Sequence, residues 1–504
     1  MWVREGCLAQ LEISTGNCMK QNSGLLSYGT YVPRRRLQRS SIHDNNKWFA
    51  PGLGSLAKGE KAISGWDEDP ITMAVEAGRN CVDSIDRSQL EALSLSSTTL
   101  PFADRSNSGV VKEAMNLGDT ISVSDRTGSM RAGTTALLDA LHGNRMQLCL
   151  AADRRKTKIA SAEEMTYGDA AAALLVGSGD VIANYLGGKS ASIDFVDHFR
   201  ATESDYDYAW EARFTRDEGY QKILGATIKE ALASLNIDGE SIAHAVIAAP
   251  ARGVPQKLAK TAGIPVAAVA DTLVANIGDT GAAHPLLMLA NTLHQAKPGE
   301  KVLLASFGQG ADVMVFETTE HLATVNARQQ SVMAPGLADT AYSRYLFHRG
   351  QLDIEKGQRA ELDEKQPGTS LARDRKTVLG LVGGKCSKTG TVQFPKTEIS
   401  VNQDSRETDT QEDYLFADRM AKVLSFTADR LAYSPDPPNY HGIIDFEGGG
   451  RMVVEFADVE DGEVEVNAAM RMVFRIKSFD ELRGFRKYFW KATPIHSVAK
   501  PGEQ

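Results

Sequence analysis

The sequence predicts an α/β protein built from a duplicated unit, followed by a smaller β-rich domain. Residues 168–176 and 307–316 each join a glycine turn to small apolar residues, and each half also has a glycine turn before a leucine-rich helix. Such a repeat indicates internal duplication of a βαβ-rich unit. After about residue 320 the composition changes, and residues 412–495 alternate apolar and polar residues in short runs. These runs predict a small OB-like barrel of about five strands.

Composition limits the class of protein. The chain has 504 residues, of which 42% are hydrophobic and 24% are charged, enough for two or three domains with sizeable cores. Its formal net charge of -9 argues against general nucleic-acid binding, although local basic clusters can still hold an anionic ligand. Five scattered cysteines without framework spacing fit a reducing cytoplasm. No apolar run approaches the roughly 20 residues of a membrane span, so no membrane association is expected.

The first half is expected to alternate strands and helices. Apolar runs, capping residues and turns predict strands at residues 24–33, 92–99 and 145–151, and helices at residues 70–85 and 107–117. Arg34-Arg35-Arg36 forms the densest positive cluster and is interpreted as a solvated face. Gly168-Asp169 opens a run of small apolar residues and is interpreted as close backbone packing without a chemical role.

Residues 124–142 are the stretch around which the chain is organised. A strand at residues 120–123 leads into a turn at Gly128 and Ser129, and small residues and leucines at helical spacing continue to about Leu141. Such a turn presents one side chain at a helix N-terminus, where unpaired N–H groups and the helix dipole favour an anion. Nucleophiles of condensing enzymes are often mounted in this way.

The segment Met130-Arg-Ala-Gly-Thr-Thr-Ala-Leu137 resembles the nucleophile motif of the thiolase superfamily, in the branch of 3-hydroxy-3-methylglutaryl-CoA synthase and ketoacyl synthase III. The resemblance implies a five-layered fold with a helix layer between two sheets. In that branch the position four residues before Thr134 is the acyl-accepting cysteine, and here it is Met130. A thioether has no acidic proton and cannot carry an acyl group as a stable thioester.

Three further catalytic positions of the family are also altered. The resemblance places the general acid and base glutamate at Thr98, the histidine that activates or orients the donor acyl-CoA at Ala248, and the asparagine of the last glycine turn at Asp279. An alcohol titrates too far above neutral pH to replace the proton transfer of a carboxylate. Four altered positions predict a pocket without its usual acid, nucleophile and histidine.

Substitutes for these lost groups remain open. Ser129 adjoins the nucleophile position, and Asp279 with His284 would supply an acid–base pair if both face the pocket. A serine acylates readily only beside a positioned base, so Ser129 is interpreted as a turn residue and His284 as a core or interface histidine. The predicted phosphate contacts for coenzyme A or an acyl-CoA are Arg131, Arg252, Lys257 and Lys260.

Residues 386–403 resemble the zinc ribbon that precedes the OB-fold in small acyl-CoA-associated proteins, which partner thiolases and synthases. Of the four ligand positions only Cys386 keeps a ligand, while the others hold Thr389, Ser400 and Gln403. One thiolate cannot hold structural zinc, so we expect a metal-free ribbon, or merely a hairpin. The aromatic run at residues 487–491 is expected to pack in a core or a protein interface rather than to stack on a base.

The predicted divisions combine a duplicated thiolase-like part with an accessory part. They are an N-terminal extension (1–23), two thiolase-like halves (24–180 and 181–320), a helical linker (321–380), a degenerate zinc ribbon (381–408), an OB-fold domain (409–496) and a tail (497–504). The first 22 residues lack the continuous apolar core of a secretory signal and are expected to be a loose extension.

The leading functional hypothesis is a catalytically degenerate synthase-like subunit that organises a thiolase partner and keeps a coenzyme A pocket. Its rival is an active acyltransferase or condensing enzyme that uses Ser129, Asp279 and His284. A free-standing nucleic-acid-binding OB protein fits neither the charge nor the architecture. Because members of the family are dimers, the resemblance implies a homodimer through the thiolase-like halves within a larger assembly with thiolase.

Overall fold

The computed structural model describes residues 23–143, 145–334, 336–361 and 368–495. The predicted C-terminal tail lies outside the described residues, and so does the predicted N-terminal extension except for Ser23. Within the described ranges, no helix is both long enough and apolar enough to cross a lipid bilayer.

The first half of the chain contributes one block of five strands to a nine-stranded sheet, in the order β1-β7-β6-β4-β5. The three strands β6, β4 and β5 run parallel, and β7 is antiparallel to both of its neighbours, β1 and β6. The strands are β1 (Gly24–Tyr31), β4 (Ala92–Ser96), β5 (Ser122–Arg126), β6 (Gln147–Asp153) and β7 (Ala170–Gly177).

The second half repeats this pattern in the order β8-β13-β12-β11. Here β11 and β12 are parallel, and β13 is antiparallel to both β12 and β8. The strands are β8 (Ala183–Ser192), β11 (Ile242–Ala248), β12 (Lys301–Phe307) and β13 (Gly310–Thr318). A short antiparallel pairing of β1 with β8 joins the two blocks. The matching strand order supports the predicted duplication.

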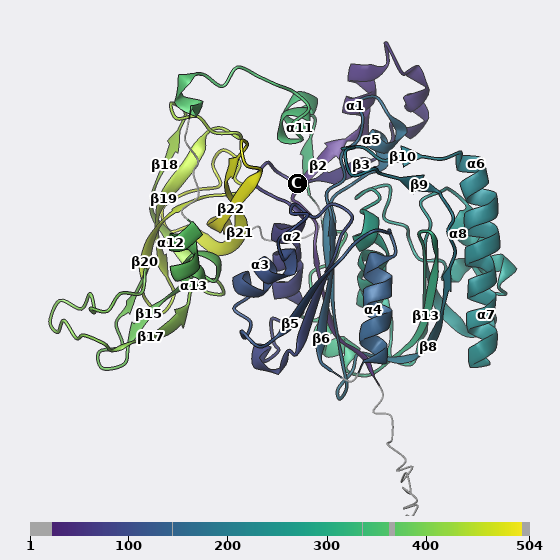
Figure 1. Cartoon of the computed structure of the whole chain (residues 1–504), viewed down its shortest axis with the longest axis horizontal. Helices are drawn as coiled ribbons and strands as arrows, with labels where there is room; N and C mark the ends of the chain where they lie inside the picture. Colours follow the sequence, from purple (N-terminus) through teal and green to yellow (C-terminus); the bar gives the residue numbers. More distant parts are fainter. Residues whose placement is uncertain (1–22, 144, 335, 362–367, 496–504) are drawn as a thin grey trace, which may run out of the picture.

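Helices cover both blocks and fill the space between them, so that the described residues between 23 and 320 form five layers (Figure 1). The central helices α4 and α9 pack against both blocks, with α4 on β6 and α9 on β7, β11 and β12. Helices α2 and α3 cover the first block, and α7 and α8 lie outside the second. The helices are α2 (Pro70–Cys81), α3 (Asn107–Ala114), α4 (Ala132–His142), α7 (Gly225–Leu235), α8 (Val254–Thr261) and α9 (His284–Gln295). The predicted thiolase-like α/β fold is thereby confirmed.

Helix α2 begins where the sequence predicts it and ends sooner. The Asp69 side chain accepts hydrogen bonds from the backbone amides of Ile71 and Thr72, both at 3.0 Å, and caps the helix. The helix ends at Cys81 rather than near residue 85. Asp83 and Ser84 follow, and both residue types are poor helix formers, with the acid also disfavoured at the negative end of the dipole.

The C-terminal part forms a five-stranded OB-like sheet in the order β20-β19-β18-β21-β22. Its strands are β18 (Ala421–Asp429), β19 (Asn439–Phe446), β20 (Arg451–Glu455), β21 (Ala469–Asp480) and β22 (Phe485–Pro494). The prediction of core packing for residues 487–491 is confirmed for Tyr488 and Trp490, which are buried. The Trp490 indole donates a 2.7 Å hydrogen bond to the carbonyl oxygen of Leu379.

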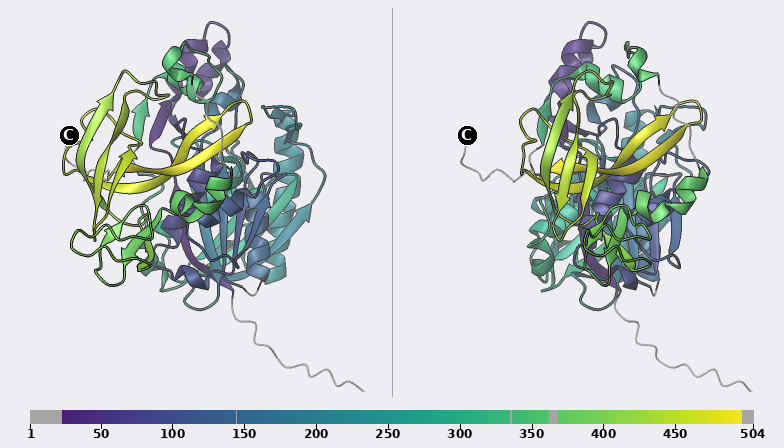
Figure 2. Two further views of the ribbon diagram at one scale, coloured as in Figure 1. Left: turned by 60° about the vertical axis from the view of Figure 1, so that its left-hand side comes forward. Right: turned by 90° about the vertical axis from the view of Figure 1, so that its left-hand side faces the viewer.

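The OB-like domain packs directly on the outer helix layer of the first half. Strand β21 contacts α2, and one continuous apolar cluster contains Ile71 and Val75 of α2 together with Phe416, Phe474 and Trp490 of the OB-like part. Figure 2 shows the yellow strands β21 and β22 lying against the purple and blue elements of the first half. The two parts therefore share a hydrophobic core.

A buried network of charges crosses the same interface. Arg475, a fully buried residue of β21, lies 2.7 Å from a carboxylate oxygen of Asp458 and 3.3 Å from one of Glu68. Its guanidinium also donates a 2.8 Å hydrogen bond to the hydroxyl of Tyr31. A buried arginine is tolerated when carboxylates compensate its charge, so this network fixes the OB-like domain in place.

The interpretation of Arg34-Arg35-Arg36 as a solvated face is wrong. The Arg34 guanidinium pairs with Glu463, and that of Arg35 lies 3.1 Å from the carboxylate of Asp436. Arg36 is buried. Partners more than 400 residues away in the sequence thus turn this cluster into an attachment for the OB-like domain.

The ribbon segment forms a small three-stranded sheet in the order β16-β15-β17. Its strands are β15 (Val382–Cys386), β16 (Val392–Gln393) and β17 (Gln411–Leu415). The Cys386 sulfur accepts a hydrogen bond from the Thr389 amide at 3.4 Å and lies 3.1 Å from the Thr410 hydroxyl. Among the residues that the structure describes, no group of three or more His, Cys, Asp or Glu is placed to hold a metal ion.

The segment between the halves and the ribbon is only partly helical. It contains α11 (Tyr342–His348), α12 (Gly368–Arg373) and α13 (Arg375–Leu379). Helix α11 packs near α1 (Arg39–Asn46), where the Tyr342 hydroxyl lies 2.9 Å from the side-chain amide of Asn46. Helix α13 packs against α3 and β22, and thus joins the two parts of the protein.

Candidate functional site

The four positions that the resemblance assigns to catalysis lie on elements that meet between the two blocks of strands. Thr98 follows β4, Met130 precedes α4, Ala248 ends β11, and Asp279 lies in the turn before α9. The turn before α9 and the start of α4 are in close contact, because a Cβ added to Gly133 would lie 2.5 Å from the carbonyl oxygen of Ala282. The carboxyl ends of parallel strands form the usual ligand-binding edge of an α/β sheet.

A buried carboxylate, Asp153 at the end of β6, occupies the space beside Thr98. Its Oδ1 accepts hydrogen bonds from the Thr98 amide at 2.7 Å and from the Thr98 hydroxyl at 3.1 Å. The hydroxyls of Ser97 and Thr99 donate to the same oxygen, each at 2.9 Å. The side chain at the glutamate position therefore holds a neighbouring carboxylate and presents no acid of its own.

The second oxygen of Asp153 fixes the turn before α9. Oδ2 accepts a 2.7 Å hydrogen bond from the Ala282 amide. Gly281 has a φ of +64°, and a Cβ added there would lie 2.3 Å from the same oxygen. Only glycine fits this position, because both the backbone conformation and the space exclude a side chain. Asp153 thus ties the Thr98 loop to the turn that carries Asp279.

Asp279, which the resemblance assigns to the asparagine position, is partly buried and forms an ion pair with the buried Arg155. The Asp279 carboxylate lies 3.1 Å from the Arg155 guanidinium, which also donates a 2.7 Å hydrogen bond to the Asp279 carbonyl oxygen. The guanidinium carbon lies 3.5 Å from the ring centre of Tyr167. A planar cation held between a carboxylate and an aromatic face is a strong and oriented contact.

The charge on Asp279 is fixed by these neighbours. Burial favours the neutral carboxyl, but Arg155, His284 and the Gly281 amide outweigh burial and lower the pKa of Asp279 to about 2. An asparagine at this position would donate hydrogen bonds through its amide, whereas an ionised carboxylate only accepts them. Asp279 is therefore a permanent anion that cannot act as a proton donor near neutral pH.

His284 is buried at the start of α9 and is not placed as a catalytic base. Its Nδ1 lies 3.3 Å from both the amide and the hydroxyl of Thr280. Burial, with a smaller effect of the Arg155 charge, lowers the pKa of His284 although Asp279 opposes the shift. The ring is neutral near physiological pH and its Nδ1 is occupied by its own turn.

The turn at the nucleophile position is held by the loop after β12. The Ser129 hydroxyl donates a 2.7 Å hydrogen bond to the carbonyl oxygen of Gly308 and accepts one from the Arg131 amide at 3.1 Å. Neither partner can remove the hydroxyl proton, so no base activates Ser129 in this arrangement. Met130, between these residues, offers only a thioether.

The Arg131 guanidinium binds partners inside the protein. Its guanidinium lies 2.8 Å from Asp312, a fully buried carboxylate, and donates a 2.9 Å hydrogen bond to the Gly308 carbonyl oxygen. Asp312 also accepts from the hydroxyls of Thr134 at 2.9 Å and Thr135 at 3.0 Å. These contacts tie α4 to β13 and use the donors that the sequence analysis assigned to coenzyme A phosphates.

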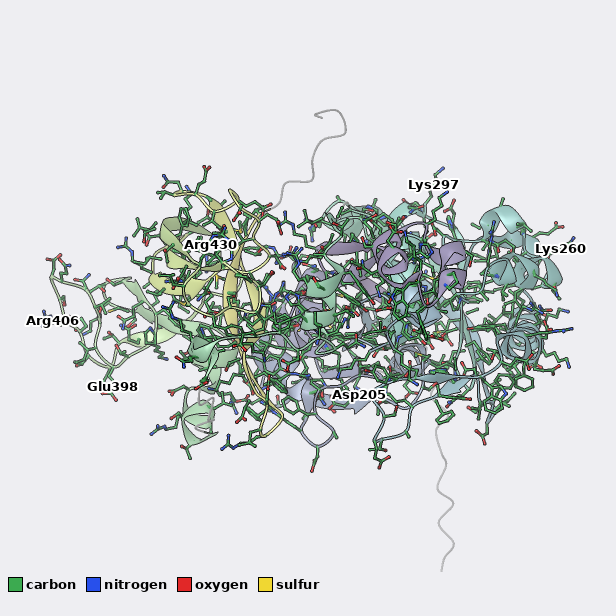
Figure 3. All side chains as sticks on the ribbon, turned by 90° about the horizontal axis from the view of Figure 1, so that it is seen from above. Asp205, Lys260, Lys297, Glu398, Arg406 and Arg430 are labelled. Carbon is green, nitrogen blue, oxygen red and sulfur yellow. The ribbon has the colours of Figure 1, made fainter. Side chains whose placement is uncertain are left out.

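The remaining predicted phosphate contacts lie together on one outer surface. Arg252, Lys257 and Lys260 are exposed residues on α8 or the loop before it. None of them has a carboxylate within 4.0 Å among the described residues. Figure 3 shows Lys260 at the end of the molecule opposite Glu398 of the ribbon segment. Ala248, just before this loop, is an almost buried methyl group without chemical function.

Sequence reasoning missed Asp153 and Arg155, the two charged residues that organise this site. They belong to the run Asp153-Arg154-Arg155, which follows a fully apolar stretch of β6. Charged residues directly after a buried parallel strand lie at the edge where ligands bind, and this signal was present in the sequence. The polar partners named for these two residues, Thr98 and Asp279 among them, are however more than 50 residues away in the sequence.

Comparison with known sequences finds two matching families. Residues 416–475 match the family described as ChsH2, C-terminal OB-fold domain, and residues 232–315 match 3-oxoacyl-[acyl-carrier-protein (ACP)] synthase III C terminal. A hydroxymethylglutaryl-CoA synthase of Methanosarcina mazei is 30% identical over 351 residues, which are 66% of this chain and 99% of the relative. One of Thermococcus gammatolerans is 29% identical over 330 residues, 64% of this chain and 92% of that relative.

Solved structures agree on the fold of the first two thirds of the chain. MvaS in complex with 3-hydroxy-3-methylglutaryl coenzyme A matches with a TM-score of 0.56 and 18% identity over 66% of this chain and 93% of that chain. The 3-oxoacyl-[acyl-carrier-protein] synthase III of Aquifex aeolicus VF5 matches with a TM-score of 0.52 and 15% identity, covering 58% and 99% of the two chains.

Proposed function

Because this chain belongs to the hydroxymethylglutaryl-CoA synthase family, we propose that it is a catalytically degenerate synthase-like subunit that binds acyl-CoA and organises a thiolase partner. The main support for this proposal is the state of the three positions assigned to the acid, the asparagine and the nucleophile. The side chains at the acid and asparagine positions, Thr98 and Asp279, are engaged by Asp153 and Arg155, while the nucleophile position holds Met130. A site with these groups lacks the chemistry for acyl transfer through a thioester.

Two chemical steps of a condensation, acyl transfer to the enzyme and proton removal from the donor, both lack a suitable residue in this proposal. Forming an acyl-enzyme requires a nucleophile whose proton has an acceptor, and the Ser129 proton is committed to a backbone carbonyl oxygen. Removing a proton from the methyl group of an acetyl donor requires a base, and Thr98 has only a hydroxyl group that donates to Asp153. Neither half of a condensation is supported by these residues.

Acyl-CoA binding is supported by the cations on the outer surface beside α8. Arg252, Lys257 and Lys260 are exposed cations within nine residues of one another, and coenzyme A carries phosphates that such groups attract. The solved relatives include an HMG-CoA synthase complexed with CoA and one with 3-hydroxy-3-methylglutaryl coenzyme A. In this proposal Arg131 holds the loop after β12 and makes no phosphate contact.

The organising role is supported by the fused OB-like domain. The resemblance of residues 386–495 to accessory proteins of thiolases motivates a thiolase as the partner. The outer surface of this domain carries exposed apolar side chains, among them Leu431, Val453 and Val466. Single exposed apolar side chains are common on protein surfaces, and in this proposal these three lie in the interface with the partner. The proposed assembly is a homodimer through the thiolase-like halves that binds thiolase subunits.

The deciding experiment is intact-protein mass spectrometry of the pure chain after incubation with acetyl-CoA and acetoacetyl-CoA, with release of coenzyme A followed in parallel. We expect neither a covalent adduct nor release of coenzyme A. Calorimetry should still detect acyl-CoA binding, and a thiolase added as a separate protein should co-elute with the chain on size-exclusion chromatography.

The rival is an active acyltransferase that uses Ser129, Asp279 and His284. It is favoured by the ionised carboxylate of Asp279 close to a neutral imidazole. An acyl adduct mapped to Ser129, lost in Ser129→Ala, would establish this rival and overturn the proposal of a non-catalytic subunit.

A further inference from the structure

A large cavity lies between the OB-like domain and the first half of the chain, beside the core that the two parts share. It has a volume of about 1600 Å³ and is lined by the loop at Trp66, the end of α11 and the strands β20, β21 and β22. Pockets for small molecules usually measure about 300–1,000 Å³, so this space is large enough for a ligand of nucleotide size with its water. Thr98, Met130, Ala248 and Asp279 are not among its lining residues.

The charge of the lining is opposite to that of the chain. Thirteen arginines and lysines line the cavity against ten aspartates and glutamates. The chain as a whole has 56 basic residues and 65 acidic ones. An excess of positive charge within a concave, partly enclosed wall concentrates anions there, because the low-dielectric surroundings focus the field.

Arg154 is a cation of the cavity wall that no carboxylate touches directly, although the charges of Asp169 and Asp69 act on it from farther away. Its guanidinium donates to three neutral oxygens, the Ser64 hydroxyl at 2.8 Å and the carbonyl oxygens of His348 at 2.7 Å and Gly65 at 3.4 Å. Among the described residues no carboxylate lies within 4.0 Å of this guanidinium. Burial and the nearby Arg349 charge lower the pKa of Arg154 to about 10, so the group remains a cation at neutral pH.

Two more guanidinium groups lie close to Arg154. Arg349 pairs with the buried carboxylate of Asp169, and the nearest carboxylate oxygen to Arg486 belongs to Asp69 at 3.6 Å. The charges of both arginines act on Arg154, and all three line the cavity. The three guanidinium groups face two nearby carboxylates, Asp169 and Asp69, so the cluster keeps an excess of positive charge that an anion from outside the chain would balance.

We propose that this interdomain cavity binds a phosphorylated small molecule, whose phosphate group is held by Arg154 with help from Arg486. Guanidinium groups present several donors in one plane and bind phosphate oxygens two at a time. Trp66 also lines the cavity, and the Lys491 ammonium group lies 4.4 Å from its ring centre, so one ring face is covered and an organic portion of the ligand would contact the rest of the indole. The site is distinct from the α8 surface proposed above for acyl-CoA, because Arg252, Lys257 and Lys260 do not line it.

Isothermal titration calorimetry of the full chain with sodium pyrophosphate tests the site. The variant Arg154→Gln keeps hydrogen-bond donors but removes the charge, and we expect at least a tenfold loss of affinity for pyrophosphate. Arg451→Gln is the matched control, because Arg451 lies on the exposed face of the OB-like domain outside the cavity lining. This control should bind pyrophosphate as the unaltered chain does.

A second titration, with adenosine 3′,5′-bisphosphate, shows whether the ligand of the cavity is a nucleotide or a simple phosphate. Tighter binding than for pyrophosphate, lost in Arg154→Gln, would assign the cavity to a nucleotide-type ligand, whereas equal affinity assigns it to simple phosphates. If Arg154→Gln fails to fold, as judged by its thermal transition, Arg486→Gln takes its place, and weaker pyrophosphate binding is expected for that variant.

Absence of pyrophosphate binding, or binding that Arg252→Ala abolishes and Arg154→Gln does not, would overturn the proposal. If acyl-CoA does not bind at the α8 surface, the cavity proposal still stands. The variant Arg252→Ala tells the two sites apart, because it alters only the α8 surface.

Discussion

The hydroxyl of Thr98 donates a 3.1 Å hydrogen bond to the carboxylate of Asp153, which is fully buried. The position that the resemblance assigns to a general acid thus stabilises a carboxylate at the end of the neighbouring strand β6. A glutamate at residue 98 would place a second negative charge beside Asp153, and like charges at this distance oppose ionisation of one another.

Replacement of Thr98 by valine should lower the free energy of unfolding by about 1.5 kcal/mol, the usual value for a hydrogen bond to a charged group. Thr98→Ser, which keeps the hydroxyl, should lie within about 0.5 kcal/mol of the unaltered chain. Denaturation in urea, followed by circular dichroism, measures both. Equal stability of the two variants would show that the hydroxyl does not support Asp153.

Stability should decrease as the pH falls below about 6.5, in part because of His284. Burial lowers the pKa of His284 from 6.5 in the folded chain, so the unfolded chain takes up a proton in this range and the folded chain does not. Proton uptake by the unfolded state favours unfolding, by up to about 1.4 kcal/mol per pH unit for one group. Asp279 does not contribute between pH 5 and 8, because its pKa falls from 3.8 to about 2 on folding.

Thermal transitions at pH 5 to 8 test this dependence in the unaltered chain and in His284→Gln, where the decrease should be smaller. His348 is also buried with a lowered pKa, so His348→Gln is a parallel variant that should remove a separate part of the slope. An unchanged slope in His284→Gln would mean that the imidazole is protonated in the folded state as well.

Substitution of Arg475 by methionine should destabilise the whole chain by about 3–5 kcal/mol, because the buried Glu68 and the partly buried Asp458 would lose their counter-charge. Arg451→Met removes an exposed ion pair with Asp445 and should change stability by less than about 1 kcal/mol. Differential scanning calorimetry measures both variants. A large effect confined to a separate low-temperature transition would contradict a shared core.

Acyl-CoA affinity should depend on the cations beside α8. Replacing Arg252 and Lys257 together by alanine should weaken acetyl-CoA binding by about tenfold, which corresponds to about 1.4 kcal/mol. Lys297→Ala is a suitable control, since Lys297 is an exposed lysine that Figure 3 places away from Lys260. Calorimetric titration with acetyl-CoA gives the comparison, and unaltered affinity in the double variant would remove this surface from the proposal.

Local patterns were sufficient to predict most of the elements of the fold. The start of α2 follows from the Asp69-Pro70 pair, since a cap and a proline at the first turn act within a few residues of sequence. Gly168 lies as expected in a closely packed backbone, where an added Cβ would meet the carbonyl oxygen of Ile277 at 1.9 Å. The OB-like strands likewise follow from alternation along short runs.

Contacts between distant segments account for what the sequence did not reveal. Arg155 reaches Asp279 across 124 residues, and Arg34 reaches Glu463 across 429. A charged side chain has the same appearance in a sequence whether it ends in water or in a buried pair, so Arg34 was misjudged and Asp153 was overlooked. Which partner it meets is decided by the tertiary arrangement of the two parts.

The apolar core shared by α2 and the OB-like strands has a consequence for how this protein would work with others. An accessory domain on a flexible tether can swing between active sites, but a domain fixed by Trp490, Arg475 and a continuous apolar cluster cannot. Any intermediate passed between a bound enzyme and this chain must therefore travel along a path of fixed length, set when the subunits assemble.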